Sequence, residues 1–327
     1  MVEVEKQANK KASAFRSTLR KKFAVDGWFI LFGLLPILVI YAYLRIIPIG
    51  KSVYMSFFNW DYVSNDNSYI GLGNYVRMFQ NKQFLISLRN TTIIAFAMFF
   101  VIMPLSLLIA NALNSKIKFI AWYETFYFLP VIMPMVPITI IWKWILNTDY
   151  GLLNWFLSLF NIQKHAWLTS PDLAIVVVIA IMVWKNIGYN ILIYLVGLRG
   201  IPKSYYEAAA LDGATSGQCF WHISLPQLKP ITIYVSVTTL IKGYNVYSLV
   251  SILASDIQGA PGYLVRVLVY DMIENAFRYF KMGYASAEAV ILFLIVLVLT
   301  ILQMGFMRER KRRPSKISAL KRGAKRC

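Results

Sequence analysis

The stretch Tyr206-Glu207-Ala208-Ala209-Ala210-Leu211-Asp212-Gly213-Ala214, followed by Ile223-Ser224-Leu225-Pro226, lies between two apolar runs of membrane length. Its first part has the features of a short helix, because Ser204 is placed to cap it and Glu207, three positions later, completes a capping box. The alanines favour helix, and Gly213 permits the helix to stop. So short a helix buries little of its own surface. We therefore expect it to pack against the rest of the protein or against a partner protein.

The composition around this stretch indicates a membrane protein. The chain has 327 residues, 58% of them hydrophobic, and 34 Lys and Arg against 15 Asp and Glu. The basic residues gather mostly at the two ends, outside the apolar runs, which is typical of membrane topology and anionic lipid contact rather than nucleic-acid binding. Cys219 and Cys327 both fall on the predicted cytoplasmic side, where disulfides are rare.

Six apolar runs reach the length of about 20 residues that a membrane-spanning helix needs. We therefore predict an all-α membrane protein, with residues 1–26 as a cytoplasmic basic segment, 27–307 as a six-helix transmembrane domain and 308–327 as a cytoplasmic basic tail. An even number of spans, with Lys and Arg in excess on the side of the termini, also makes the loop 199–228 cytoplasmic. The predicted spans are Trp28 to Ile47, Thr91 to Leu113, Phe126 to Leu146, Leu173 to Leu198, Ile231 to Leu253, and Ala285 to Phe306.

The third span contains Pro130, Pro134 and Pro137. Each proline removes a backbone donor, so we expect this helix to be kinked or broken and to be supported by its neighbours. The loop at 48–90 is rich in aromatic residues such as Trp60. It suits either contact with a partner outside the membrane or an interfacial aromatic belt with a short surface helix.

Several nucleotide-binding, metal-binding and catalytic motifs are absent from the sequence. No Gly-x-x-x-x-Gly-Lys-Ser/Thr occurs, so any ATP that the protein uses must be bound by another subunit. His165 and His222 have no cysteine or carboxylate partners at metal spacing, so we expect no metal site. No nucleophile motif or paired carboxylates are present within a span, so we predict that the chain is not an enzyme by itself.

The stretch that opens this section carries a resemblance to a known family. Glu207, Ala208, Ala209, Gly213, Ile223, Leu225 and Pro226 match, at all seven positions, the cytoplasmic signature of permease subunits of bacterial ATP-binding-cassette importers. Further stretches resemble the carbohydrate-uptake, maltose-type branch of these permeases. These are Tyr69 to Tyr75, Gly188-Tyr189, Gly197 to Pro202 and Met282 to Ala287.

The resemblance implies a six-helix permease of the bacterial inner membrane that moves a carbohydrate inward by alternating access. It implies a second homologous permease subunit, two ATPase subunits that bind ATP and Mg, and an extracytoplasmic solute-binding protein. The segment from Glu207 to Gly213 would be a coupling helix in a cleft of an ATPase subunit, with Glu207 facing a basic residue there. No cofactor is implied for this chain.

Lys185 and Lys242 fall near the middle of the fourth and fifth predicted spans. A cation there costs about 2.5 to 3.5 kcal/mol on insertion scales and is normally kept for a pathway or a pair. We therefore predict an anionic oligosaccharide as solute, such as a uronate oligomer of the alginate or pectin kind, with Lys242, Asn245, Lys185 and Tyr189 as the first candidate ligands. The other candidates are the polar and aromatic residues around them, Asn186, Asn190, Tyr244 and Tyr247.

Two alternatives stay open at this point. Each lysine can instead be a structural residue, bonded to carbonyl groups of broken helices or to the partner subunit. The chain can also be a secondary, ion-coupled transporter, a class that often has intramembrane carboxylates. The predicted spans offer only Glu288, near the outer edge of the last one.

Overall fold

A computed structural model describes residues 28, 32–61, 63, 67–114, 118–255 and 265–307. The protein is helical, and its β contacts within these ranges are the isolated bridges Phe58–Tyr69 and Asp61–Lys281. The basic segments predicted at 1–26 and 308–327 lie outside the described residues.

Four helices of the described chain are long and apolar enough to cross a membrane. Each covers most or all of one predicted span and extends beyond it at one end or both. They are the helix Phe32–Met55, which includes the π-helical turn η1 (Ala42–Ile46) and α2 (Ile47–Met55), then α4 (Lys82–Leu113), α8 (Pro171–Arg199) and α15 (Met282–Met307).

The predicted break in the third span is confirmed. The chain forms α5 (Ile120–Ile132) and α6 (Met135–Ile145), which meet at an angle of 100°. Met133 and Pro134 are extended between them. Since Pro134 has no N–H, the chain leaves the helix at this point and the last carbonyls of α5 lose their helical partners.

The expectation of a continuous fifth span at Ile231 to Leu253 is wrong. The chain there forms α12 (Lys229–Tyr244) and α13 (Ser248–Ser255), and it leaves the helical conformation at Asn245. Gly243 lowers the helix propensity next to this point, and beyond the break α13 packs on α6. Within the described ranges, length and composition therefore support four spans, or five with the bent pair, and the six-span count is not confirmed.

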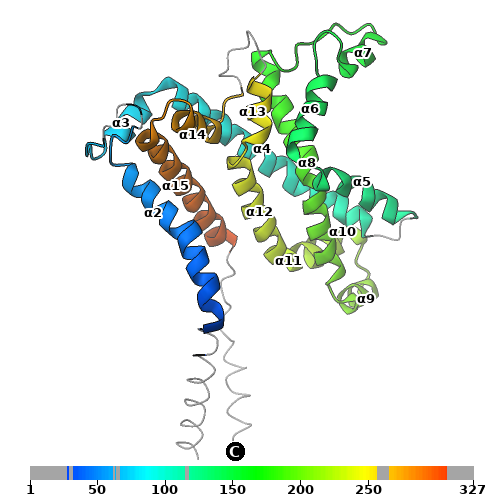
Figure 1. The fold of residues 1–327 in the computed structure, drawn as a ribbon. Coiled ribbons are helices and arrows are strands. Elements are labelled where there is room, and N and C mark those ends of the chain that lie inside the picture. Colours follow the sequence, from blue (N-terminus) through cyan, green and yellow to red (C-terminus); the bar gives the residue numbers. More distant parts are fainter. Residues whose placement is uncertain are drawn as a thin grey trace, which may run out of the picture.

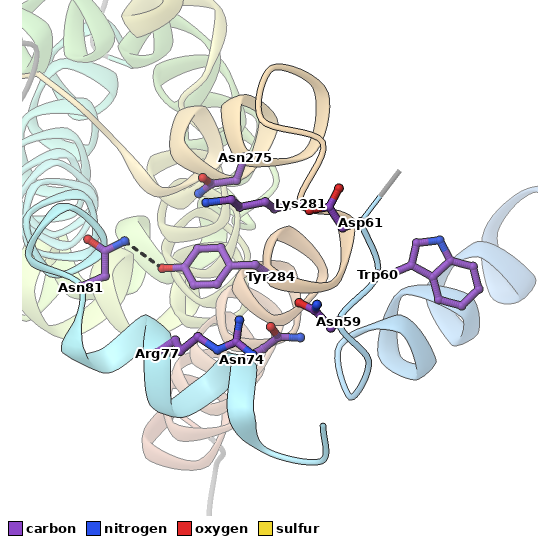
Figure 2. Close-up of a pocket in the computed structure, with 9 residues that line it drawn as sticks. All are labelled: Asn59, Trp60, Asp61, Asn74, Arg77, Asn81, Asn275, Lys281 and Tyr284. Atoms are coloured by element: carbon purple, nitrogen blue, oxygen red, sulfur yellow. Dashed lines mark hydrogen bonds between the residues drawn. The ribbon is translucent and has the colours of Figure 1, made fainter. Parts of the chain in front are cut away.

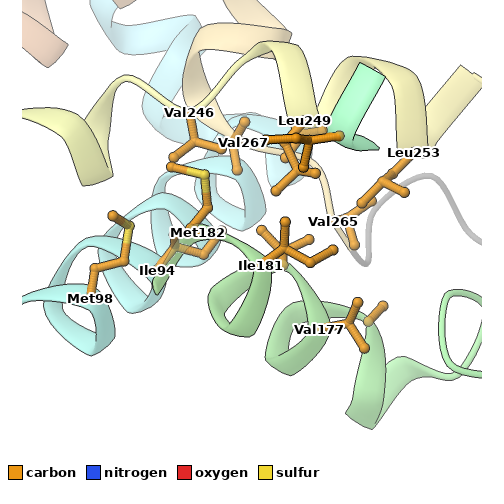
Figure 3. Close-up of a cluster of buried hydrophobic side chains, with 14 of the residues drawn as sticks. Ile94, Met98, Val177, Ile181, Met182, Val246, Leu249, Leu253, Val265 and Val267 are labelled. Atoms are coloured by element: carbon orange, nitrogen blue, oxygen red, sulfur yellow. The ribbon is translucent and has the colours of Figure 1, made fainter. Parts of the chain in front are cut away.

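Helix α4 runs through the centre of the molecule and packs on both α8 and α12, while α6 packs on α13 (Figure 1). Gly243 lets α12 approach α4 closely, because an added Cβ would lie 2.6 Å from the Cα of Ala95. Since lipid is as apolar as these side chains, close packing rather than burial from water holds them together. The cluster in Figure 3 shows this packing, with Ile94, Met98, Val177, Ile181, Met182, Val246, Leu249, Leu253, Val265 and Val267.

Short helices occupy the two ends of the molecule (Figure 1). One end carries α3 (Gly73–Gln80), α7 (Leu152–Ser158) and α14 (Leu268–Phe277). The surface helix anticipated in the 48–90 loop is thus α3. The other end carries the loop after α8, which consists of α9 (Lys203–Leu211), α10 (Ser216–Cys219), the π-helical turn η2 (Phe220–Ser224) and α11 (Leu225–Gln227).

Candidate functional site

Helix α9 contains the Glu-Ala-Ala stretch, and it begins differently from the prediction. Pro202 is the N-cap and the helix starts at Lys203, with no side-chain cap. The capping box at Ser204 and Glu207 is therefore wrong, because Ser204 is already inside the first turn. Pro202 is extended, so the chain can turn into the helix directly after it. The Glu207 carboxylate is exposed, and no hydrogen bond or ion pair engages it within the described chain.

The end of α9 agrees with the prediction for Gly213. Its φ is +78°, in the left-handed region that glycine adopts without strain. The N–H of Ala214 donates to the carbonyl of Ala209 at 2.9 Å, and the N–H of Gly213 donates to that of Ala210 at 3.1 Å. These two bonds form a Schellman motif, so Gly213 sets the direction in which the chain leaves the helix. The capping box of this loop lies at Thr215 and Gln218, which start α10.

The loop from α9 to α11, named here the coupling segment, is tied to the bundle and presents apolar side chains outward. Tyr206 and Ser224 join its two halves through their hydroxyl groups at 2.9 Å. Ile223 packs against the buried cluster at the end of α8. In contrast, Leu211 is 91% exposed and Trp221 is 64% exposed. Sequence reasoning did not single out these two residues, although an apolar rim beside an exposed acid is typical of a protein interface.

A second site lies where α6, α8 and the break after α12 meet. A cavity of about 290 Å³, named here the lysine cavity, brings together five of the predicted residues. Its remaining walls are Met135 of α6, Met182 of α8, Val246 of the break, and Ser248 and Leu249 of α13. The predicted residues that line it are Lys185, Asn186, Lys242, Asn245 and Tyr247.

Lys185 supports the broken span. Its ammonium group donates to the carbonyl oxygens of Pro130 at 2.7 Å, Val131 at 3.0 Å and Met133 at 2.7 Å. These carbonyls belong to the end of α5 and the break that follows it. An ammonium group has three N–H donors, so all three are engaged in this arrangement. Lys185 thus matches the structural alternative, while its charge still lies beside the lysine cavity.

Lys242 has a different environment. Its ammonium nitrogen lies 4.4 Å from the centroid of the Tyr189 ring, a cation–π distance. The Tyr189 hydroxyl is 2.9 Å from that of Tyr234. Throughout the described ranges, neither Lys242 nor Lys185 forms an ion pair with an acidic residue. Lys242 is exposed, so its N–H donors are available in the cavity.

Three predicted residues do not line the lysine cavity. They are Tyr189, whose ring faces Lys242, and Asn190 and Tyr244. Asn190 is buried and donates to the carbonyl of Asn186 at 3.1 Å. Tyr244 is buried against α4, where its hydroxyl donates to Thr92 at 3.4 Å. The Asn190 side chain thus bonds within α8, whereas Tyr244 joins α12 to α4.

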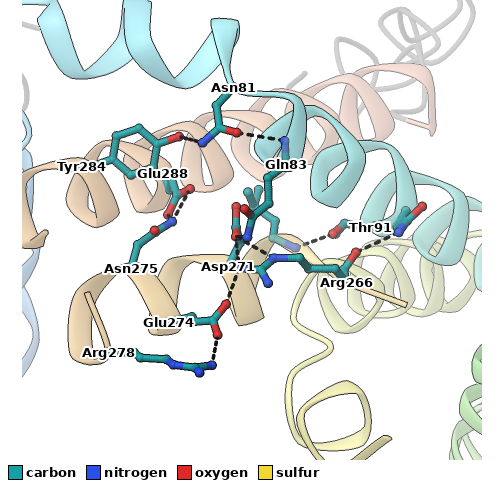
Figure 4. A network of polar contacts seen from close by, with 12 residues as sticks. Asn81, Gln83, Thr91, Arg266, Asp271, Glu274, Asn275, Arg278, Tyr284 and Glu288 are labelled. Atoms are coloured by element: carbon teal, nitrogen blue, oxygen red, sulfur yellow. Dashed lines mark hydrogen bonds and ion pairs between the residues drawn. The ribbon is translucent and has the colours of Figure 1, made fainter. Parts of the chain in front are cut away.

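A polar network that the sequence reasoning missed holds α14 to the rest of the protein (Figure 4). Arg266 donates to Asp271 at 2.8 and 2.6 Å and also pairs with Glu274. Glu274 in turn accepts from Arg278 at 2.6 Å. Burial lowers the pKa of the Arg266 guanidinium, but the two neighbouring carboxylates raise it by more, so its net pKa shift is upward. The network therefore contains two cations and two anions.

A polar cavity of about 380 Å³ lies near α3 and the start of α15 (Figure 2). Most of its amide groups bond within the protein; for example, Asn74 donates to the carbonyls of Ser56 and Phe58, each at 2.9 Å. The side chains of Arg77 and Lys281 are exposed on its walls. With Asp61 also in the lining, this cavity carries two cations and one anion, and it lies at the same end of the molecule as α14.

No group of three or more His, Cys, Asp or Glu side chains that could hold a metal ion occurs in the part of the chain that the structure describes. His222 lies 3.1 Å from the carbonyl of Gln218, and the ring of His165 lies 5.2 Å from that of Trp167. Each histidine is thus engaged locally.

Comparison with known proteins gives a consistent family match. Residues 102–312 match the family described as the binding-protein-dependent transport system inner membrane component. The chain is 34% identical to the probable ABC transporter permease protein YurN of Bacillus subtilis, over 85% of this chain and 95% of that protein. It is 30% identical to the arabinooligosaccharides transport system permease protein AraP of Bacillus subtilis, over 90% of this chain and 92% of that protein.

Two crystal structures of a bacterial alginate ABC transporter share the fold. The first gives a TM-score of 0.79 at 22% identity and covers 90% of this chain and 99% of the other. The second, solved in complex with an alginate pentasaccharide-bound periplasmic protein, gives a TM-score of 0.76 at 22% identity. It covers 88% of this chain and 96% of the other.

Proposed function

Because the chain belongs to the family of binding-protein-dependent transport system inner membrane components, we propose that it conducts an oligosaccharide with acidic groups through its lysine cavity. It is a permease of an ATP-binding-cassette sugar importer, as its curated relatives and its fold indicate. This membership favours the ATP-driven importer over the ion-coupled transporter. The Glu288 carboxylate, which alone suggested ion coupling, is buried and accepts two bonds from Asn275 at 3.1 Å.

One observation carries the proposed substrate class. The lysine cavity contains an exposed ammonium group, Lys242, and a second cation, Lys185, with no acidic partner for either one in the described chain. A carboxylate of the solute would supply the missing charge to Lys242 by direct hydrogen bonds. Lys185 would act through its charge alone, because its three donors are engaged. Asn186, Asn245 and Tyr247 offer further groups for sugar hydroxyls.

The proposed mechanism is alternating access. ATP and Mg bind to two partner ATPase subunits, whose closure moves the coupling segments of two homologous permeases. The coupling segment would be the site where an ATPase subunit docks. Three features support this role: the exposed Glu207, the exposed apolar side chains of Leu211 and Trp221, and the direction in which Gly213 makes the chain leave α9. A solute-binding protein would dock at the opposite end, where the polar cavity near α3 lies. This chain transmits motion and lines the path.

The substrate proposal is tested on the importer purified with its partner subunits and reconstituted in liposomes. Uptake and substrate-stimulated ATP hydrolysis are measured with an alginate pentasaccharide and with maltopentaose, a neutral sugar of the same length. We expect the acidic pentasaccharide to stimulate both activities. Stimulation by maltopentaose alone would contradict the acidic substrate class and leave the permease assignment unchanged.

The orientation in the inner membrane gives a separate prediction. We expect both termini and α9 to be cytoplasmic and α7 to lie outside. Ser158 on α7 and Ser204 on α9 are both exposed, so each is replaced by cysteine in a protein with Cys219→Ser and Cys327→Ser. A membrane-impermeant maleimide added to intact spheroplasts should label Ser158→Cys and should label Ser204→Cys only after lysis. Labelling of Ser204→Cys in intact spheroplasts would overturn this orientation.

A Gly213→Val variant should lose most of its coupling. Valine in the left-handed region costs about 1 to 2 kcal/mol, so the chain would leave α9 in another direction. The added Cβ meets no heavy atom within 4 Å, so the effect comes from the backbone and not from a clash. We expect uptake to fall roughly tenfold while the amount of assembled importer stays the same.

Gly217→Val is the matched control for this variant. Gly217 is also exposed, and its added Cβ is also free of contacts, but the residue lies inside α10 and needs no positive φ. Gly217→Val should therefore transport normally. If Gly213→Val also transports normally, then the direction in which the chain leaves α9 has no role in coupling.

A further inference from the structure

A third cavity adjoins the lysine cavity. It has a volume of about 350 Å³ and is lined by Tyr247, Tyr270, Ile273, Glu274, Phe277 and Arg278. Tyr247 lines both cavities, so the two are neighbours along one surface. We name this one the aromatic cavity. Except for Tyr247, its lining residues belong to α14 or follow it directly, at the end of the molecule opposite α9 (Figure 1).

Aromatic rings form the main surface of this cavity. The rings of Tyr247 and Tyr270 are nearly parallel, with an interplanar angle of 29° and centroids 6.4 Å apart. The Phe277 side chain is 67% exposed. Flat aromatic surfaces beside a few polar groups are typical of sites that bind small polar molecules through one apolar face. A sugar ring has such a face, surrounded by hydroxyl groups.

The polar groups of the aromatic cavity differ from those of the lysine cavity in charge. Glu274 forms ion pairs with Arg266 and Arg278, and Asp271 forms a further ion pair with Arg266. The two cations and two anions of this group give it no net charge. An additional anion would gain little from such a neutral group. Sugar hydroxyls, however, can donate to the remaining lone pairs of Glu274 and accept from the remaining donors of Arg278. The aromatic cavity therefore suits a sugar ring whatever the charge of its substituents.

The cavity is also rigid. The N–H of Leu268 donates to Thr91 at 2.8 Å, and Asn90 donates to the carbonyl of Arg266 at 2.9 Å. Gln83 donates to Asp271 at 3.1 Å, so three bonds fix the start of α14 on α4 (Figure 4). A site that is fixed before its ligand arrives loses little entropy on binding. This anchoring fixes the start of α14, where Tyr270 lies, before any ligand binds.

We propose that the aromatic cavity is an entry subsite that binds the ring face of a sugar unit while the lysine cavity holds an acidic unit of the same chain. The subsite rests on the proposed function, since it needs a carbohydrate that moves inward. It lies at the outer end of the path, so the solute reaches it before Lys242. It selects for ring shape, whereas Lys242 selects for charge.

Photo-cross-linking in the complete reconstituted importer tests the subsite directly. Phe277 is replaced by p-benzoylphenylalanine, and the importer is irradiated during turnover with a radiolabelled alginate pentasaccharide. We expect label on the permease and competition by excess unlabelled pentasaccharide. Phe293, a phenylalanine of α15 that is 57% exposed, receives the same replacement as a control and should stay unlabelled.

A second variant separates contact from general disturbance. Tyr270→Ala should lower the cross-linking at position 277 by about three- to tenfold, which is the usual effect of losing one aromatic contact. Tyr270→Phe keeps the ring and should preserve the labelling. Tyr247, which lines both cavities, is replaced by p-benzoylphenylalanine in a further importer. Label at position 247 in that importer, with none at position 277 in the first, would overturn the subsite and leave the lysine cavity intact. Failure of the unsubstituted importer to take up the pentasaccharide would instead contradict the proposed function, and the subsite with it.

Discussion

A permease with Glu207→Lys is expected to insert and assemble normally and to support roughly a hundredfold less uptake. Glu207 is exposed on α9 and has no partner within the described chain, so its replacement removes no internal contact. If α9 docks in a basic cleft of an ATPase subunit, then the lysine places like charges across the interface. Such a juxtaposition costs several kcal/mol, and each 1.4 kcal/mol is a factor of ten.

The measurements are uptake, ATP hydrolysis and the amount of ATPase subunit that copurifies with the permease. Asp212→Lys is the control and should transport normally, because it makes the same change of charge at the C-cap of α9, more than one helical turn from Glu207. Glu207→Gln should give an intermediate loss, since it removes the attraction without adding repulsion. Normal uptake by Glu207→Lys would show that α9 is a connector without a charged partner.

The role of Gly213 could be read from the sequence because it depends on local chemistry. A glycine after a run of alanines predicts a left-handed helix end, and the structure has φ +78° there. Pro130 and Pro134 likewise predicted the break between α5 and α6, because the missing backbone N–H of a proline removes a hydrogen bond from the helix that contains it. The start of α9 was mispredicted for a related reason. Both Pro202 and Ser204 are suited to the N-terminus of a helix. Which of them becomes the N-cap depends on the direction from which the preceding chain enters the helix.

Contacts between distant segments could not be predicted from the sequence. The break after Tyr244 divides a run that is apolar enough for one span, and it becomes apparent only from the packing of α13 on α6. The network of Arg266 joins residues of α4 to α14, nearly 200 positions later, and no spacing rule connects them. Lys185 and Lys242 look equivalent in sequence. Only the position of the broken helix distinguishes their surroundings.

That difference gives the last prediction, in which the same substitution has opposite consequences at the two lysines. Lys185→Met leaves the carbonyls of Pro130, Val131 and Met133 without their donor. Each unsatisfied buried group costs about 1 to 3 kcal/mol, so we expect a lower thermal stability and less assembled importer. A normally stable, fully assembled Lys185→Met importer would contradict this structural role.

Lys242→Met should leave assembly intact, because the Lys242 ammonium group is exposed and its contact among the described residues is with the face of Tyr189. Methionine keeps most of the length and removes the charge. A hydrogen bond to a charged group contributes about 1.5 to 3 kcal/mol, so uptake of the alginate pentasaccharide should fall at least tenfold. Binding of the pentasaccharide to the isolated solute-binding protein is unaffected by the variant and serves as the control. Unchanged uptake would remove Lys242 from the path, whereas failure to assemble would make both lysines structural. The two variants therefore distinguish a lysine that binds the free carbonyl groups of a broken helix, Lys185, from one that binds the solute, Lys242.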